Sequence, residues 1–84
     1  MNFKIYYKVK IRYNDLVSKE VEYDMTGKEP LTFQINDTIE TNFINDNSWY
    51  KLKINDVIIN TEYYDSSKTM IYNVSIITKE NCSN

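Results

Sequence analysis

The side chains that most often perform catalysis are almost missing from this chain. Its 84 residues include no histidine, and the only cysteine is Cys82, close to the C-terminal end. General acid–base chemistry would fall to carboxylates such as Glu20 and Glu22, but the strand pattern gives each a lysine neighbour, which keeps a carboxylate ionised. The sequence has no glycine-rich phosphate loop and no cluster of cysteine and histidine. We therefore predict a protein that is not an enzyme and that has no metal and no cofactor.

A basic row near the N-terminus is the first pattern suited to binding a partner. Its side chains alternate with apolar residues and share one face of a predicted strand: Lys4, Tyr6, Lys8, Lys10 and Arg12. Small β-barrels bind single-stranded nucleic acid with such faces, because bases stack on the ring while lysines contact the phosphates. The alternative is a solvated face on which acidic neighbours neutralise the lysines. The predicted acidic neighbours Glu20, Glu22 and Asp24 favour the second interpretation, and the net charge of −2 has the wrong sign for binding nucleic acid through bulk charge.

A second candidate surface belongs to the last third of the chain. One face of the strands predicted there carries more large apolar side chains than a solvated sheet surface usually does. Its candidate partner-binding residues are Trp49, Lys51, Lys53, Ile58, Tyr64 and Ile71. Burial under other strands is the alternative explanation, and it would make Trp49 a core residue.

Two amphipathic strands are predicted to position the basic row. Apolar and polar residues alternate from Phe3 to Tyr13 and again from Val17 to Met25. A loop of three residues, 14–16, or a loop of five would set the same face of each strand in register. The predicted opposite pairs are Lys10 with Glu20, Lys8 with Glu22, Tyr6 with Asp24, Val9 with Val21 and Tyr7 with Tyr23.

The C-terminal third predicts a three-stranded meander, preceded by two shorter strands at 31–35 and 39–43. Alternation over 50–54, 57–63 and 70–76 is interrupted at Asn55-Asp56 and at 65–68. A turn at the first interruption would set Leu52 opposite Ile59, and a turn at the second would set Ile59 opposite Val74. Every inward side chain would then oppose another inward side chain.

The dipeptide Asn-Asp recurs between apolar runs. It begins at Asn14, Asn36, Asn45 and Asn55. Asparagine tolerates positive φ, and both side chains hydrogen-bond nearby backbone, so the pattern predicts four turns. A calcium loop would need closely spaced oxygen donors, a glycine and a terminal glutamate in one stretch, and none of these segments has them.

The fold class predicted from these strands is all-β. The sequence favours a small antiparallel barrel of the SH3-like or OB-like kind, or a two-sheet sandwich, with residues 1–80 as a single domain and 81–84 as a short tail. No apolar run approaches the length of a membrane span, and a lone cysteine fits a reducing compartment. We therefore expect a cytoplasmic protein without a membrane partner.

Residue usage also suggests an origin. Isoleucine, asparagine, lysine and tyrosine are abundant and alanine is absent, as AT-rich coding favours, and such chains are common among phages and mobile elements. We expect a non-enzymatic protein-binding module that inhibits or adapts a host protein, for example in anti-defence, with another protein as its partner. The alternative is a small nucleic-acid-binding β-barrel. A homo-oligomer formed through the C-terminal sheet face is also compatible with the pattern.

Overall fold

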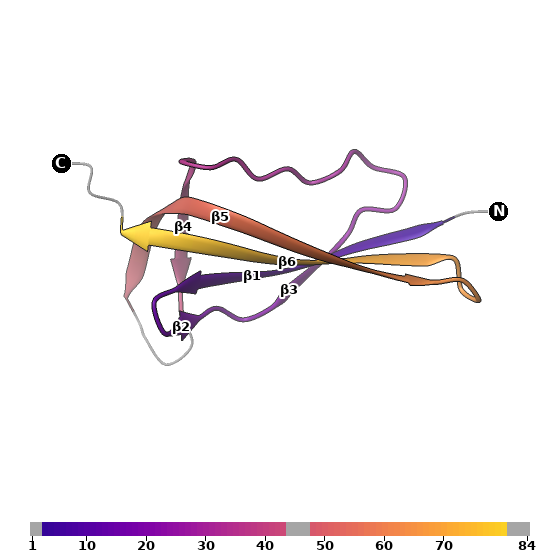
Figure 1. Cartoon of the computed structure of the whole chain (residues 1–84), viewed down its shortest axis with the longest axis horizontal. Helices are drawn as coiled ribbons and strands as arrows, with labels where there is room; N and C mark the ends of the chain where they lie inside the picture. The colour runs from indigo at the N-terminus through magenta and orange to yellow at the C-terminus, as the bar shows by residue number, and fades with distance from the viewer. Residues whose placement is uncertain (1–2, 44–47, 81–84) are drawn as a thin grey trace.

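Strands supply all the regular structure of the described chain. A computed structural model describes residues 3–43 and 48–80. The strands are β1 (Lys4–Tyr13), β2 (Leu16–Val17), β3 (Val21–Asp24), β4 (Thr38–Asn42), β5 (Trp49–Tyr64) and β6 (Thr69–Glu80) (Figure 1). The all-β class is therefore confirmed. Within these two ranges, no helix is long and apolar enough to cross a membrane.

The six strands form one mixed sheet with the main order β2-β1-β6-β5-β4, and β3 also pairs with β1. β1 and β6 are parallel, whereas every other pair is antiparallel. The sheet is not closed, so the predicted SH3-like or OB-like barrel is not confirmed, and the described strands form no second sheet for a sandwich. Side-chain alternation reveals which residues share a face but not the direction of a strand, so it could not predict the parallel pair.

The N-terminal hairpin follows the predicted register over most of its length. Val9 lies opposite Val21, and Lys8 lies opposite Glu22. The turn is shorter than predicted, because Tyr13 already lies opposite Leu16. The registers in which β2 and β3 pair with β1 therefore differ by one residue.

Two hydroxyl groups complete the pairing of β1 at the ends of β3. Ser18 Oγ accepts a hydrogen bond from the Ile11 amide at 2.8 Å, and the Ser18 amide donates to the Ile11 carbonyl at the same distance. Thr26 Oγ1 accepts from the Ile5 amide at 2.9 Å. These side chains satisfy backbone donors where the regular ladder stops.

β5 continues through Asn55-Asp56 as one strand. Its register against β6 shifts by one residue between Ile54 and Asp56, which marks a β-bulge. Asp56 Oδ1 accepts the Val57 amide at 2.9 Å, so the side chain that was expected to form a turn instead stabilises the bulge. The predicted turn and the three-stranded meander are therefore wrong.

Of the residue pairs predicted around that turn, one is confirmed and one is wrong. Ile59 lies opposite Val74, as predicted. Leu52 lies opposite Ile39 on β4 and Glu80 on β6, so its predicted pairing with Ile59 is wrong. A hairpin of two long strands, β5 and β6, replaces the meander.

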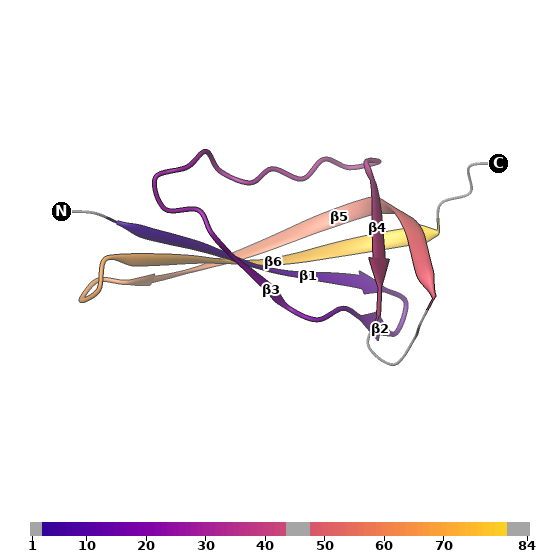
Figure 2. The same cartoon turned by 180° about the vertical axis from the view of Figure 1, so that it is seen from behind.

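The bulge turns the start of β5 over one face of the sheet, since a bulge bends its strand and increases its twist. Figure 2 shows β4 crossing in front of β6, with the segment before it running above β5 in this view. The strand predicted at 39–43 is β4. No strand forms at 31–35, although Leu31 and Phe33 pack against the core from this segment. We call the face that they cover the inner face, and the opposite one the outer face.

Two of the four predicted Asn-Asp turns are present. Asn14 has a φ of 53° and Asn36 a φ of 76°, in the left-handed region that asparagine tolerates. The turn at 65–68 is also present, with Lys68 at a φ of 52°. The turn predicted at Asn45 lies outside the described residues, as do residues 81–84.

The core lies on the inner face, where β1 and β6 run side by side. Val74 and Ile76 are each 2% exposed, and burying a side chain of this size stabilises the fold by about 1.5–3 kcal/mol. The rings of Tyr7 and Tyr72 stack with centroids 4.7 Å apart. At the end of the parallel pair, the buried Thr78 hydroxyl donates to the Arg12 carbonyl at 2.7 Å.

Candidate functional site

A groove lined mainly by apolar residues lies on the inner face of the described sheet. Its larger part has a volume of about 400 Å³ and its smaller part about 180 Å³. Both parts include Val9 and Ile11 of β1 and Tyr23 of β3, so they are continuous along β1. The larger part is completed by Leu31, Phe33, Ile39, Glu40 and Ile76, and the smaller part by Ser18, Lys19, Val21, Thr41 and Asn42.

The two long rims of the groove are edge strands. In the described chain, β3 pairs only with β1 and β4 only with β5, so each presents an unpaired backbone edge to the groove. No Cα atom of β3 lies within 8 Å of one in β4. Paired strands are about 4.8 Å apart, so β3 and β4 are too far apart to pair with each other.

The apolar side chains of the rims remain accessible. Tyr23 is 44% exposed and Val21 is 45% exposed, although the alternation in the sequence placed both on the buried side. Charges are confined to Lys19 in the smaller part and Glu40 in the larger part. The groove therefore offers an apolar floor with Lys19 beside its smaller part, whereas Glu40 lies opposite Lys51 on β5.

Sequence reasoning did not identify this groove. Its residues were assigned to the core because they alternate with polar ones, and alternation distinguishes two faces without showing whether the inward face is covered. The sequence signal nearest to it is the proline and glycine segment 26–30, which ends the strand pattern shortly after Tyr23.

The outer face brings both sequence-predicted surfaces together. The basic row of β1 lies beside β6 and then β5: Tyr6 is opposite Ile71, which is opposite Glu62. Lys10 and Ile58 share another such row across Ser75. Directly opposed residues share a face, so Ile58, Ile71 and Tyr64 belong to the same surface as the basic row.

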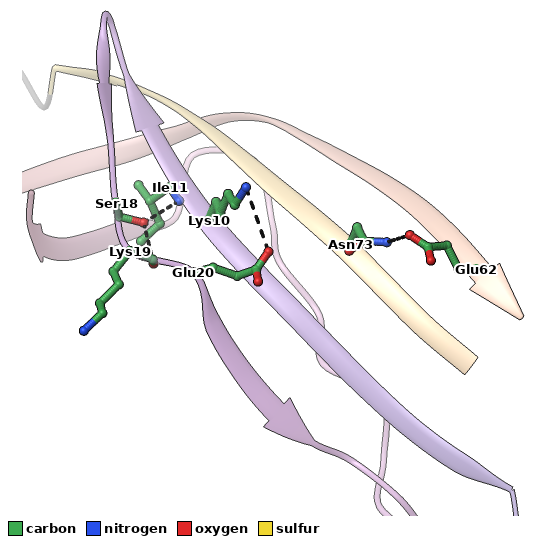
Figure 3. A network of polar contacts seen from close by, with 7 residues as sticks. All are labelled: Lys10, Ile11, Ser18, Lys19, Glu20, Glu62 and Asn73. Atoms are coloured by element: carbon green, nitrogen blue, oxygen red, sulfur yellow. Dashed lines mark hydrogen bonds and ion pairs between the residues drawn. The ribbon is translucent and has the colours of Figure 1, made fainter. Parts of the chain in front are cut away.

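Carboxylates flank the basic row on both sides. Lys10 Nζ lies 3.9 Å from Glu20 Oε1, with both side chains nearly half exposed, and Lys8 lies opposite Glu22. On the β5 side, Glu62 accepts a hydrogen bond from Asn73 Nδ2 at 3.0 Å. Figure 3 shows these two polar contacts on the β3 and β5 sides of the outer face. The ion pair expected between Lys10 and Glu20 is therefore present, and such exposed pairs contribute about 0–1 kcal/mol.

Hydrogen bonds on this face shift three pKa values. Donation from the Tyr64 hydroxyl, then from Asn73, lowers the pKa of Glu62, and the charge of Lys8 acts in the same direction. The same hydrogen bond and the negative charge of Glu62 raise the pKa of Tyr64. The backbone amide of Thr26, and then its hydroxyl, lower the pKa of Asp24. These carboxylates are thereby held ionised, which offsets the lysines between them.

The remaining residues predicted for partner binding lie elsewhere. Trp49 begins β5 and Tyr64 ends it, so at about 3.3 Å per residue they are tens of ångströms apart. Trp49 is 71% exposed, which excludes the alternative that it is a core residue. Lys51 lies opposite Glu40, and Lys53 lies opposite Thr38 on β4 and Lys79 on β6. The predicted residues therefore do not form one continuous patch.

Among the described residues, no group of three or more His, Cys, Asp and Glu side chains could hold a metal ion. Comparisons of the chain with family models, with curated proteins and with solved structures find no match, so the function has to be argued from the geometry of the groove and the sheet.

Proposed function

We propose that this protein is a non-enzymatic protein-binding module that takes an extended segment of another protein into the groove between β3 and β4. The observation that carries the proposal is the pair of unpaired strand edges on either side of an apolar floor, with no Cα atoms of the two strands within 8 Å. An inserted strand would join the two edges and close the sheet into a barrel of the kind that the sequence predicted.

Binding of an added strand would use both the unpaired strand edges and the apolar floor of the groove. Backbone hydrogen bonds to an exposed edge supply affinity, and pockets for alternate side chains supply specificity. Val9 and Ile11 would receive apolar side chains from one face of the added strand. Lys19, which lines the smaller part, would favour a segment with an acidic residue near it.

The test is selection of binders from a random peptide library, followed by affinity measurements on two matched variants. Tyr23→Ser removes a half-exposed ring that lines the groove, whereas Trp49→Ser removes an exposed ring that does not line it. We expect Tyr23→Ser to weaken binding at least about tenfold, which corresponds to about 1.4 kcal/mol. Trp49→Ser should leave the affinity unchanged.

If Trp49→Ser weakened binding and Tyr23→Ser did not, the groove would not be the binding site and the surface around Trp49 would be favoured. Binding of a single-stranded oligonucleotide that weakens steeply as salt rises would instead favour the nucleic-acid alternative. The carboxylates beside the basic row argue against that outcome. The role in inhibiting or adapting a host protein, and the phage or mobile-element origin, stay predictions from residue usage.

A further inference from the structure

A long part of the β5 edge has no partner in the described chain. β4 pairs with β5 from Trp49 to Lys53, and backbone hydrogen bonds extend the contact to Ile54, which exchanges them with Asn36 and Asp37. Beyond the bulge, Val57–Tyr64 pairs with β6 on one side only. Figure 1 shows this end of the β5–β6 hairpin at the opposite end of the molecule from β4.

This edge is unusually apolar for an exposed strand. Ile58, Ile59, Tyr63 and Tyr64 are each 46% or 47% exposed, and they occupy both faces of the strand. Glu62 is the only charged residue between 57 and 64, and the segment has no proline. Natural edge strands are usually protected from pairing by charge, proline, a bulge or a short length, and residues 57–64 have little of this protection.

We propose that a second copy of this chain pairs with this edge, antiparallel and around a two-fold axis at Thr61. In that register, Ile58 lies opposite Tyr64 of the second copy on the outer face, and Ile59 lies opposite its Tyr63 on the inner face. Asn60 lies opposite Glu62, an amide beside a carboxylate. The two-fold axis repeats each pair, so each of the four exposed apolar side chains in both copies gains an apolar neighbour across the strands.

Other positions of the two-fold axis also set outer-face residues opposite outer-face residues, but they give less complementary side-chain pairs. A two-fold axis at Asn60 sets Ile58 against Glu62 and Ile59 against Thr61, so neither isoleucine meets an apolar side chain. An axis at Glu62 places two carboxylates directly opposite each other, which is destabilising. Only the axis at Thr61 combines aromatic with β-branched partners on both faces and also pairs two threonines, and such cross-strand pairs are favourable.

The dimer is independent of the groove between β3 and β4. Pairing of β5 with β5 extends the sheet at residues 57–64, whereas the groove uses Val9, Ile11 and Tyr23 and the edges of β3 and β4. Such an isologous interface closes on itself and leaves no further β5 edge for growth. Each dimer would then carry two accessible grooves.

The oligomeric state of the intact chain tests the proposal. Sedimentation equilibrium over about 1 µM to about 1 mM should reveal a species of twice the chain mass of 10.1 kDa. Ile59→Lys places a charge opposite Tyr63 and should abolish this species. Ile35→Lys is the control, because Ile35 is similarly exposed, at 51%, but does not belong to residues 57–64. A chain that is monomeric throughout, or a dimer lost equally in both variants, would overturn the proposal.

Cysteine cross-linking tests the register, even if Ile59→Lys fails to fold. In a Cys82→Ser background, Thr61→Cys places two thiols directly opposite each other, at a Cα separation of about 4.5–5.5 Å that a disulfide can span. Under mild oxidation we expect Thr61→Cys to form a linked dimer at least tenfold faster than Asn60→Cys. Preferential linkage of Asn60→Cys, or no linkage of either variant, would contradict the proposed axis.

Discussion

Replacing Thr78 by valine tests the parallel pairing of β1 and β6, the feature of the fold that the sequence could not reveal. The Thr78 side chain is 7% exposed and donates to the Arg12 carbonyl at 2.7 Å across 66 residues of sequence. Valine keeps the branched shape but leaves that carbonyl without its donor, which costs about 1–2 kcal/mol. For a chain of this size, that loss lowers Tm by about 5–15 °C.

The direction in which Thr78→Val changes the stability shows whether the hydroxyl has a buried partner. If the hydroxyl had no buried partner, replacing it by a methyl group would stabilise the protein through added apolar burial. Urea unfolding should be followed by far-UV circular dichroism, because Trp49 is too exposed to report on the core, and at one protein concentration, because dimerisation shifts apparent stability. Thr38→Val, at an exposed position of β4, is the control and should change stability by less than about 0.5 kcal/mol. A Thr78→Val protein as stable as its parent would refute the pairing.

Three further changes should have measurable effects. Asn36→Ala should lower the unfolding free energy by about 1–2 kcal/mol, because alanine at positive φ is strained, whereas Asn55→Ala should have little effect because its φ is not positive. Leu52→Ala should cost about 2–5 kcal/mol in urea unfolding and Trp49→Ala less than about 0.5 kcal/mol, since their exposures are 2% and 71%. The pKa of Glu62 is lowered in the folded state, so its hydrogen bonds stabilise the fold above the unfolded pKa and are lost as pH falls through the folded one. The gap between the urea midpoints of the parent and Glu62→Gln should therefore shrink below about pH 4, and a gap that stays constant into acid would contradict this.

The alternation of apolar and polar residues in the sequence correctly predicted which residues share a face of the sheet. Val9 and Val21 lie opposite each other, as do Ile59 and Val74, because a half-buried strand specifies its register through its apolar side chains. The same rule holds across the unpredicted parallel pair, where Val9 lies opposite Val74. Faces could be predicted because they depend on neighbouring residues, whereas strand order and direction depend on contacts between residues far apart in the sequence.

The Asn55-Asp56 pair shows why the candidate sites were harder to predict than the faces. Asparagine and aspartate suit a turn and a bulge equally well, since each needs only a side chain that bonds to nearby backbone. The choice is made by distant partners: Asn36 and Asp37 hold the Ile54 backbone on one side of β5, and β6 continues beside the strand on the other. No local pattern contains that information.

The bulge also connects the two candidate interaction surfaces. By bending β5, it carries β4 over the inner face, where the β4 edge forms one rim of the groove opposite β3. Pairing along this edge of β5 ends with the bonds of Ile54 to Asn36 and Asp37, so Val57–Tyr64 has a free edge. A turn at the same position would have reversed the chain, and residues 57–63 would then have paired with 50–54 instead of presenting that edge. The groove and the free edge therefore have one structural origin, the extra residue in β5 between Ile54 and Asp56.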